Sequence, residues 1–75
     1  MEGYQEIPIE TDNIKLQQFL KWANIVESGG IAKLLIQEGK IKVNGEVEYK
    51  RGRRLVNGDT VEINGYSKFK VITTP

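Results

Sequence analysis

The spacing of apolar residues changes at Gly39, and this change limits the possible folds more than any other feature. Before Gly39 apolar residues recur every three or four positions, as in amphipathic helices; after it they alternate with polar residues, as in half-buried strands. Helices followed by short strands predict an α+β fold, with two adjacent helices packed on a small, mainly antiparallel twisted sheet of four to five short strands. Because 75 residues hold one core, we expect a single domain over residues 1–75.

The first helix is expected to begin near Ile14, because residues 11–13 (Thr-Asp-Asn) are all favourable N-cap types. Its apolar stripe consists of Leu16, Phe19, Leu20 and Ala23. Residues 24–27 then form a connector.

A second helix is expected from a cap at Ser28 to about Glu38, and Gly39 would end it in a left-handed conformation. The residues predicted to face inward are Ile31, Leu34 and Leu35.

Strands are expected on both sides of the helix pair. Residues 4–9 predict an edge strand, since Pro8 cannot donate to a ladder. After Gly39, Asn44-Gly45 is a strong hairpin signal between alternating residues 41–43 and Val47. Tight turns at 57–59 and 64–65 flank a further strand. We therefore divide the chain into an acidic edge strand (1–12), a motif core (14–63) and a C-terminal strand (64–75).

Composition excludes several kinds of chemistry. The chain has no cysteine and no histidine, which removes thiolate nucleophiles, Ser-His-Asp hydrolases and zinc sites built on thiolate or imidazole. We expect no enzyme, no cofactor and no metal. The start of the sequence is acidic, unlike a signal peptide, and no apolar run approaches the roughly 20 residues of a membrane span. A cytoplasmic monomer without membrane contact is the expectation.

The net charge of +1 conceals a segregation of charge. Residues 1–12 hold four of the ten acids and none of the eleven bases, so residues 13–75 keep eleven bases against six acids. Because binding responds to local potential, the placement of these cations decides whether a polyanion can bind.

Cations and polar groups of the helix pair and the first hairpin are candidates for one basic ridge. The candidates there are Lys15, Lys33, Gln37, Lys40 and Lys42. A loop rich in cations is expected to fold back beside this ridge; it contributes Lys50, Arg51, Arg53 and Arg54. Each of these side chains has an alternative interpretation as an ordinary solvated cation.

Two further features leave alternatives open. Ser28-Gly29-Gly30 places two glycines in the first turn of a helix, either to expose backbone N–H groups to a phosphate or to allow close helix packing. Trp22 lies off the apolar stripe of the first helix, which suits either packing at the rim of the domain or stacking on a base.

Four blocks of the sequence resemble the ribosomal-protein-S-four-type RNA-binding domain, also called the alpha-L RNA-binding motif. They are KLQQFL (15–20), SGGIAKLLI (28–36), GKIKVNG (39–45) and GDTVEI (58–63). The chain looks like a small stand-alone bacterial member. The resemblance implies binding of structured RNA, often ribosomal, through the helix pair and the hairpin. The matching positions are Lys15, Ser28, Lys33, Lys40, Lys42 and Asn44.

The sequence departs from that family at two positions. Gly29 stands where the family usually has Arg, and Gln17 replaces a common Asp. One cationic contact is therefore missing, and residues 50–54 are expected to compensate for it.

A β-grasp-like protein-interaction domain is the alternative, because Val-Asn-Gly and Gly-Asp also occur in such small sheets. Sulfur-carrier chemistry is not expected, since the sequence ends in Ile-Thr-Thr-Pro rather than Gly-Gly. A regulatory subunit whose acidic N-terminus meets a basic partner is a third possibility.

Overall fold

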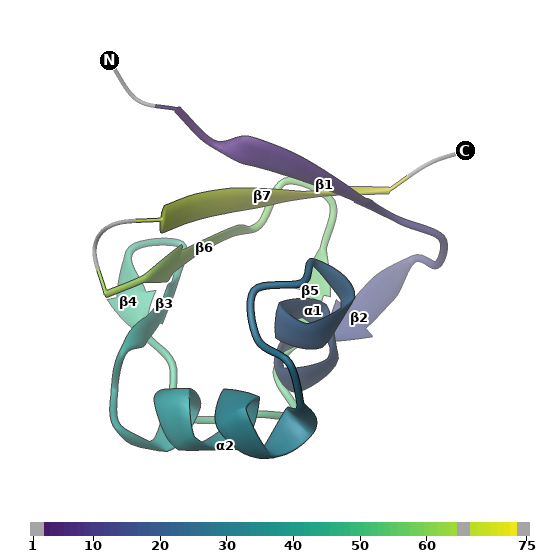
Figure 1. Ribbon diagram of the computed structural model, residues 1–75. Coiled ribbons are helices and arrows are strands. Elements are labelled where there is room, and N and C mark those ends of the chain that lie inside the picture. The colour runs from purple at the N-terminus through teal and green to yellow at the C-terminus, as the bar shows by residue number, and fades with distance from the viewer. Residues whose placement is uncertain (1–2, 65–66, 74–75) are drawn as a thin grey trace.

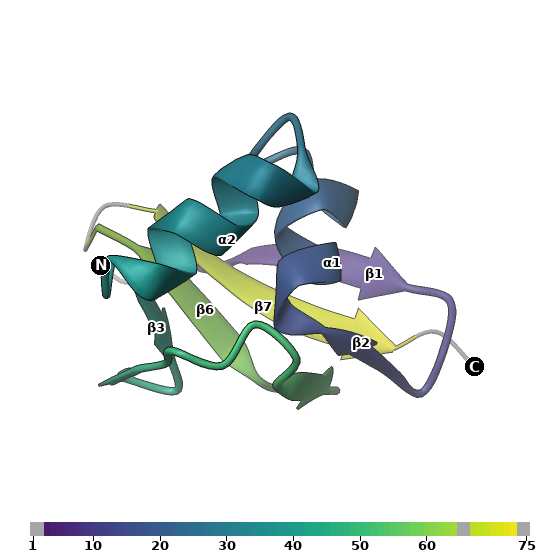
Figure 2. The ribbon, with the colours of Figure 1, turned by 90° about the horizontal axis from the view of Figure 1, so that it is seen from below.

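The computed structural model describes residues 3–64 and 67–73, which form a sheet with a helix pair on one face (Figure 1). In chain order the elements are β1 (Gln5–Ile9), β2 (Asn13–Lys15), α1 (Leu16–Trp22), α2 (Gly29–Gln37), β3 (Ile41–Val43), β4 (Glu46–Val47), β5 (Arg54–Val56), β6 (Thr60–Ile63) and β7 (Ser67–Thr73). Seen from below, both helices lie in front of β6 and β7 (Figure 2). The predicted α+β fold with two adjacent helices on a small sheet is confirmed.

The main sheet has five strands in the order β1-β7-β6-β3-β4. The pairing of β1 with β7 is parallel, and the other pairings are antiparallel. The edge position of the strand that carries Pro8 is confirmed. So is the hairpin turn: Asn44 and Gly45 have φ angles of 52° and 88°, as a type I′ turn requires. Of the expected turn at 64–65, Gly65 lies outside the described residues.

The predicted start of the first helix is wrong. Residues 13–15 form β2, which pairs antiparallel with β5, and α1 begins at Leu16 after Lys15, whose side chain makes no capping hydrogen bond. The first free N–H groups of α1 instead donate to carbonyls of the loop between β4 and β5. Leu16 N donates to Arg53 O (2.8 Å) and Gln17 N to Arg51 O (3.0 Å). Acceptors that lie far away in the sequence therefore replace the local cap, which explains the error.

The second helix keeps its predicted ends but not its predicted face. Ser28 is the N-cap and accepts from Ile31 N (3.3 Å), and Gly39 has a φ of 74°. The fully buried residues of α2 are Ala32 and Ile36, whereas Ile31 and Leu34 are exposed. The inward face predicted from Ile31 and Leu34 is therefore wrong; Leu35 is half-buried against the core.

The core lies between the helix pair and the inner face of the sheet. Its fully buried side chains include Ile9, Leu16, Phe19, Leu20, Ile36, Ile41, Leu55, Val61 and Val71. Because neighbouring strand residues point to opposite faces, the residues between the buried ones lie on the outer face of the sheet, away from the helices. This alternation places Lys42 on the outer face.

Candidate nucleic-acid interface

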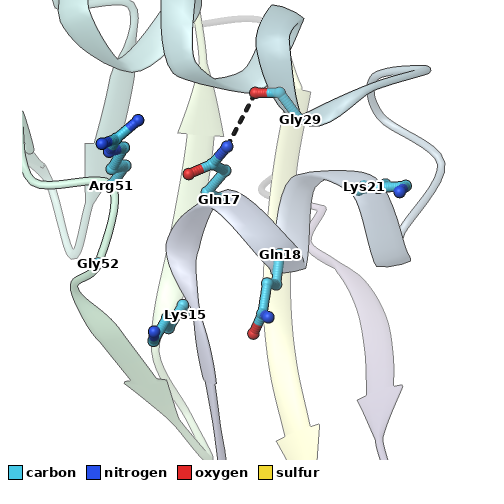
Figure 3. A pocket seen from close by; sticks show the side chains of 7 residues that line it. All are labelled: Lys15, Gln17, Gln18, Lys21, Gly29, Arg51 and Gly52. Atoms are coloured by element: carbon cyan, nitrogen blue, oxygen red, sulfur yellow. Dashed lines mark hydrogen bonds between the residues drawn. The ribbon is translucent and has the colours of Figure 1, made fainter.

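Three cations line one pocket beside α1, although they come from distant parts of the chain (Figure 3). The described lining residues are Lys15, Gln17, Gln18, Lys21, Gly29, Arg51 and Gly52, and we call this surface the basic pocket. Of these residues none carries a carboxylate. Neither of the ion pairs in the described part of the chain, Lys40–Glu38 and Arg53–Glu48, involves Lys15, Lys21 or Arg51. The pocket therefore presents positive charge that no neighbouring side chain of its lining neutralises.

The loop between β4 and β5 holds Arg51 against α1. The carbonyl of Arg51 itself accepts from Gln17 N, and Arg53 N donates to Lys50 O (3.1 Å), which closes a tight turn. The expectation that this loop folds back beside the helix pair is met at the backbone level by these hydrogen bonds. The same contacts that cap the first turn of α1 thus fix one wall of the basic pocket.

An ion pair inside this loop determines which arginine stays available. Arg53 Nη1 donates to Glu48 Oε1 at 2.6 Å, and Lys50 N donates to the other carboxylate oxygen at 3.2 Å. The hydrogen bond from Arg53 is the main cause that lowers the pKa of Glu48 below its usual value, against a smaller opposing effect of burial. Glu48 is thus ionised at neutral pH and binds Arg53 internally, whereas Arg51 lines the pocket.

Gly29 lies where the two helices approach each other. Gln17 Nε2 donates to the carbonyl of Gly29 (3.0 Å), and a Cβ at Gly29 would approach that nitrogen to 3.1 Å. A Cβ at Gly30 would meet only Ser28 Oγ at an ordinary 3.8 Å. A side chain at position 29 would require only a small shift of the flexible end of Gln17, and one at position 30 would require none, so close packing does not by itself account for either glycine.

The basic pocket contains three of the residues predicted from the sequence, namely Lys15, Gly29 and Arg51. Lys33 and Gln37 follow Gly29 by one and two turns of α2 and are exposed, so they extend the same helix face. The side chain of Ser28 is engaged as the helix cap.

Other predicted residues lie elsewhere or have intramolecular partners. Lys42 is on the outer face of the sheet, in register with Glu62. Lys40 lies 3.9 Å from Glu38, and Arg54 Nη1 donates to Asn13 Oδ1 (2.8 Å). The expected single ridge is thus divided between two faces of the molecule.

Asn44, which the resemblance implied as a binding residue, has a structural role in the turns. Its Nδ2 donates to Asp59 Oδ1 (3.0 Å), and its Oδ1 accepts from Thr60 N (2.9 Å). These bonds join the β3–β4 hairpin to the turn that precedes β6.

The sequence interpretation did not include Lys21 or Gln18 in the site. Lys21 follows Gln17 by four residues and Gln18 by three, so the helical period places it beside them. Following the helical period from Gln17 or Gln18 along the polar face of α1 would have found it.

Across residues 3–64 and 67–73, no three acidic side chains gather closely enough to hold a metal ion. In the same part of the chain, neither helix has the length and apolar composition needed to cross a membrane.

Sequence and fold together match a known class. The family model for the S4 domain matches residues 7–72, so the chain belongs to the S4 domain family. The solution structure of YbcJ from Escherichia coli, which reveals an alpha-L motif involved in RNA-binding, is 32% identical with a TM-score of 0.69 and covers 96% of this chain and 91% of YbcJ. The fold is that of the alpha-L motif, which favours this class over the β-grasp-like alternative.

Two of the relatives are small bacterial proteins. The chain is 47% identical to the probable ribosome maturation protein RlbA of Bacillus subtilis (strain 168), over 88% of this chain and 93% of that protein. It is 40% identical to the putative RNA-binding protein YbcJ of Escherichia coli (strain K12), over 73% and 79%. The crystal structure of 30S ribosomal protein S4e from Thermoplasma acidophilum shares the fold alone, with 20% identity and a TM-score of 0.57 over 75% of this chain and 30% of that one.

Proposed function

We propose that this protein is a non-enzymatic RNA-binding module that recognises structured RNA, either ribosomal RNA or a ribosome-assembly intermediate. The observation that carries the proposal is the basic pocket, whose described lining contains Lys15, Lys21 and Arg51 and no carboxylate. The names of the relatives support it, since one is a probable ribosome maturation protein and another a putative RNA-binding protein. We further propose that it acts in the cytoplasm as a monomer and without a cofactor.

Recognition is expected to depend on phosphates more than on bases. Lysine and arginine bind phosphate oxygens, and the release of counterions from the RNA supplies much of the affinity. An A-form duplex is recognised mainly by its shape, its 2′-hydroxyls and its phosphates. The basic pocket would hold the sugar–phosphate backbone, and Lys33 and Gln37 would extend the contact along α2.

Charge reversal in the basic pocket tests the function. Lys15→Glu combined with Arg51→Glu should abolish binding to a fluorescently labelled ribosomal RNA fragment, as measured by anisotropy. A glutamate at position 15 lies at the N-terminus of α1, where the helix dipole favours it, so the fold should be retained. The far-UV circular dichroism spectrum checks this.

The matched control reverses the charge of two lysines on the outer face of the sheet. Lys42→Glu with Lys70→Glu changes the net charge by the same amount but leaves the basic pocket intact. It should retain most of the wild-type affinity. Equal losses in the two double variants, or no binding of RNA by the wild type, would contradict the proposal.

A further inference from the structure

An apolar groove adjoins the basic pocket. Its described lining residues are Ile14, Gln18, Lys21 and Trp22, and we call it the Trp22 groove. Gln18 and Lys21 also line the basic pocket, so the two surfaces are continuous. The side chain of Trp22 is 49% exposed, although indole is one of the largest apolar groups a protein can bury.

The exposed indole is held in a fixed position. Trp22 Nε1 donates to the carbonyl of Pro8 at 2.8 Å, which joins the last residue of α1 to the edge strand β1. The polar edge of the ring is thus satisfied within the protein. The rest of the ring forms a wall of the groove, where it needs no further hydrogen bond and loses little freedom on contact with a flat ligand.

The charges around the groove determine how a bound nucleotide would be oriented in it. On the side of α1, Lys21 leads to the cations of the basic pocket. A smaller hollow that shares Ile14, Gln18 and Trp22 with the groove is lined in part by Glu10 and by Asn13. The amide oxygen of Asn13 already accepts from Arg54. A phosphate is attracted to the first side and repelled by the carboxylate of Glu10, whereas an uncharged planar group can occupy the apolar centre.

We propose that the Trp22 groove binds one unpaired base of the RNA, whose phosphate lies in the basic pocket. The inference rests on the proposed function and makes it more specific, because the preferred ligand becomes a structured RNA with an unstacked nucleotide rather than a continuous duplex. Stacking on an aromatic ring is tolerant of base identity. The apolar wall of the groove suits the base of a nucleotide, and the adjoining cationic pocket suits its phosphate.

The test compares three RNAs. The first is a perfect duplex of about 16 base pairs; the second carries one unpaired adenosine in its centre; the third replaces that adenosine by an abasic ribose, which keeps the phosphate and removes the base. Wild-type protein should bind the adenosine bulge about 10-fold more tightly than the abasic bulge. Trp22 is the only tryptophan of the chain, so its fluorescence should change with the adenosine bulge and not with the abasic one.

Two variants assign the preference to the ring. Trp22→Leu should bind all three RNAs with the affinity of the wild type for the abasic bulge. Trp22→Phe keeps an aromatic ring but loses the hydrogen bond to Pro8, and it should retain most of the preference for adenosine. If Trp22→Leu does not fold, as judged by circular dichroism, Trp22→Phe and the wild-type fluorescence decide the question.

The outcomes separate this inference from the proposed function. Equal affinity for the adenosine and abasic bulges, with unchanged Trp22 fluorescence, would overturn the base site while RNA binding through the basic pocket stands. An apolar side chain of a protein partner would then be the better occupant. If the wild type binds none of the three RNAs, the proposed function and the base site both fail.

Discussion

The basic pocket and the outer face of the sheet each present three cations, yet their electrostatic surroundings differ. The pocket has Lys15, Lys21 and Arg51, and its described lining contains no acid. The outer face has Lys42, Lys68 and Lys70. There the strand register places Glu62 directly between Lys42 and Lys68.

The third outer lysine also has an acidic neighbour. Lys70 lies in register with Glu6 of β1. Opposite charges in neighbouring strands stabilise a sheet and cancel much of each other's field. The comparison teaches that the polyanion-binding capacity of this chain follows from where its carboxylates lie, and a count of its cations does not reveal it.

The largest expected effect is the loss of RNA affinity when the three cations of the basic pocket are removed. The triple variant Lys15→Ala, Lys21→Ala, Arg51→Ala should lose about 10²- to 10³-fold in RNA affinity at 0.1 M salt, because about three counterion-releasing contacts disappear. Anisotropy titration of the adenosine-bulged duplex measures it.

The outer-face counterpart removes the same charge with Lys42→Ala, Lys68→Ala and Lys70→Ala. Its affinity should fall by less than about 5-fold, through the loss of long-range attraction that salt screens. Similar losses in the two triple variants would break the comparison.

The comparison would also break if the hairpin next to Lys42 bound RNA through Asn44. We expect Asn44→Ala to lower the free energy of unfolding by about 2 kcal/mol, since alanine tolerates a φ of 52° poorly and three side-chain hydrogen bonds are lost. Urea unfolding measures this change. The affinity of the folded variant for RNA should equal that of the wild type; a tenfold loss without a loss of stability would assign Asn44 to the interface.

A gain of function at Gly29 would sharpen the comparison. Gly29→Arg adds a fourth cation to a pocket lining without carboxylates, and we expect about 5-fold tighter RNA binding from one further phosphate contact. The new Cβ requires only the flexible end of Gln17 to shift. The matched control Gly3→Arg adds a cation at an exposed glycine outside the pocket lining and should change affinity less. Equal effects of the two variants would refute a specific role for the pocket.

The smallest predicted effect is on stability and concerns Glu48, whose ion pair with Arg53 leaves that arginine unavailable to the RNA. Its lowered pKa means that the ion pair stabilises the fold above the usual value of 4.5 and that this contribution is lost as pH falls through the folded-state pKa. Both side chains are partly exposed, so Glu48→Gln should cost only about 0.5 to 1 kcal/mol at pH 7.

At a pH well below that pKa the wild type and Glu48→Gln should unfold at the same urea concentration. A difference in stability that is as large in acid as at neutral pH would show that Glu48 stabilises the loop by packing rather than by its charge.

Elements whose determinants are local were predictable from the sequence. Ser28 caps α2, Gly39 ends it and Asn44-Gly45 turns the hairpin, because each conformation depends on a few neighbouring residues. The start of α1 was not predictable in this way, since its N–H groups find their acceptors in Arg51 and Arg53.

The face of α2 was ambiguous for a different reason. Apolar residues at 31, 32, 34, 35 and 36 form two overlapping stripes within nine helical residues, and tertiary packing selects the one with Ala32 and Ile36. In the candidate site, the sequence pointed to Lys15 and Arg51 but missed Lys21, and it did not show which other cations have acidic partners. Only the folded register places Glu62 beside Lys42, and only the loop conformation brings Glu48 to Arg53.

The salt dependence of RNA binding tests the central claim most directly, because its slope reports the number of phosphate contacts. For the wild type, log K plotted against log salt should fall with a slope of about −3 to −5, and the triple alanine variant of the basic pocket should reduce the magnitude of that slope by about 2 to 3. The triple alanine variant of the outer face should keep the wild-type slope. Identical slopes for the pocket variant and the wild type would contradict the claim that these three cations hold the RNA backbone.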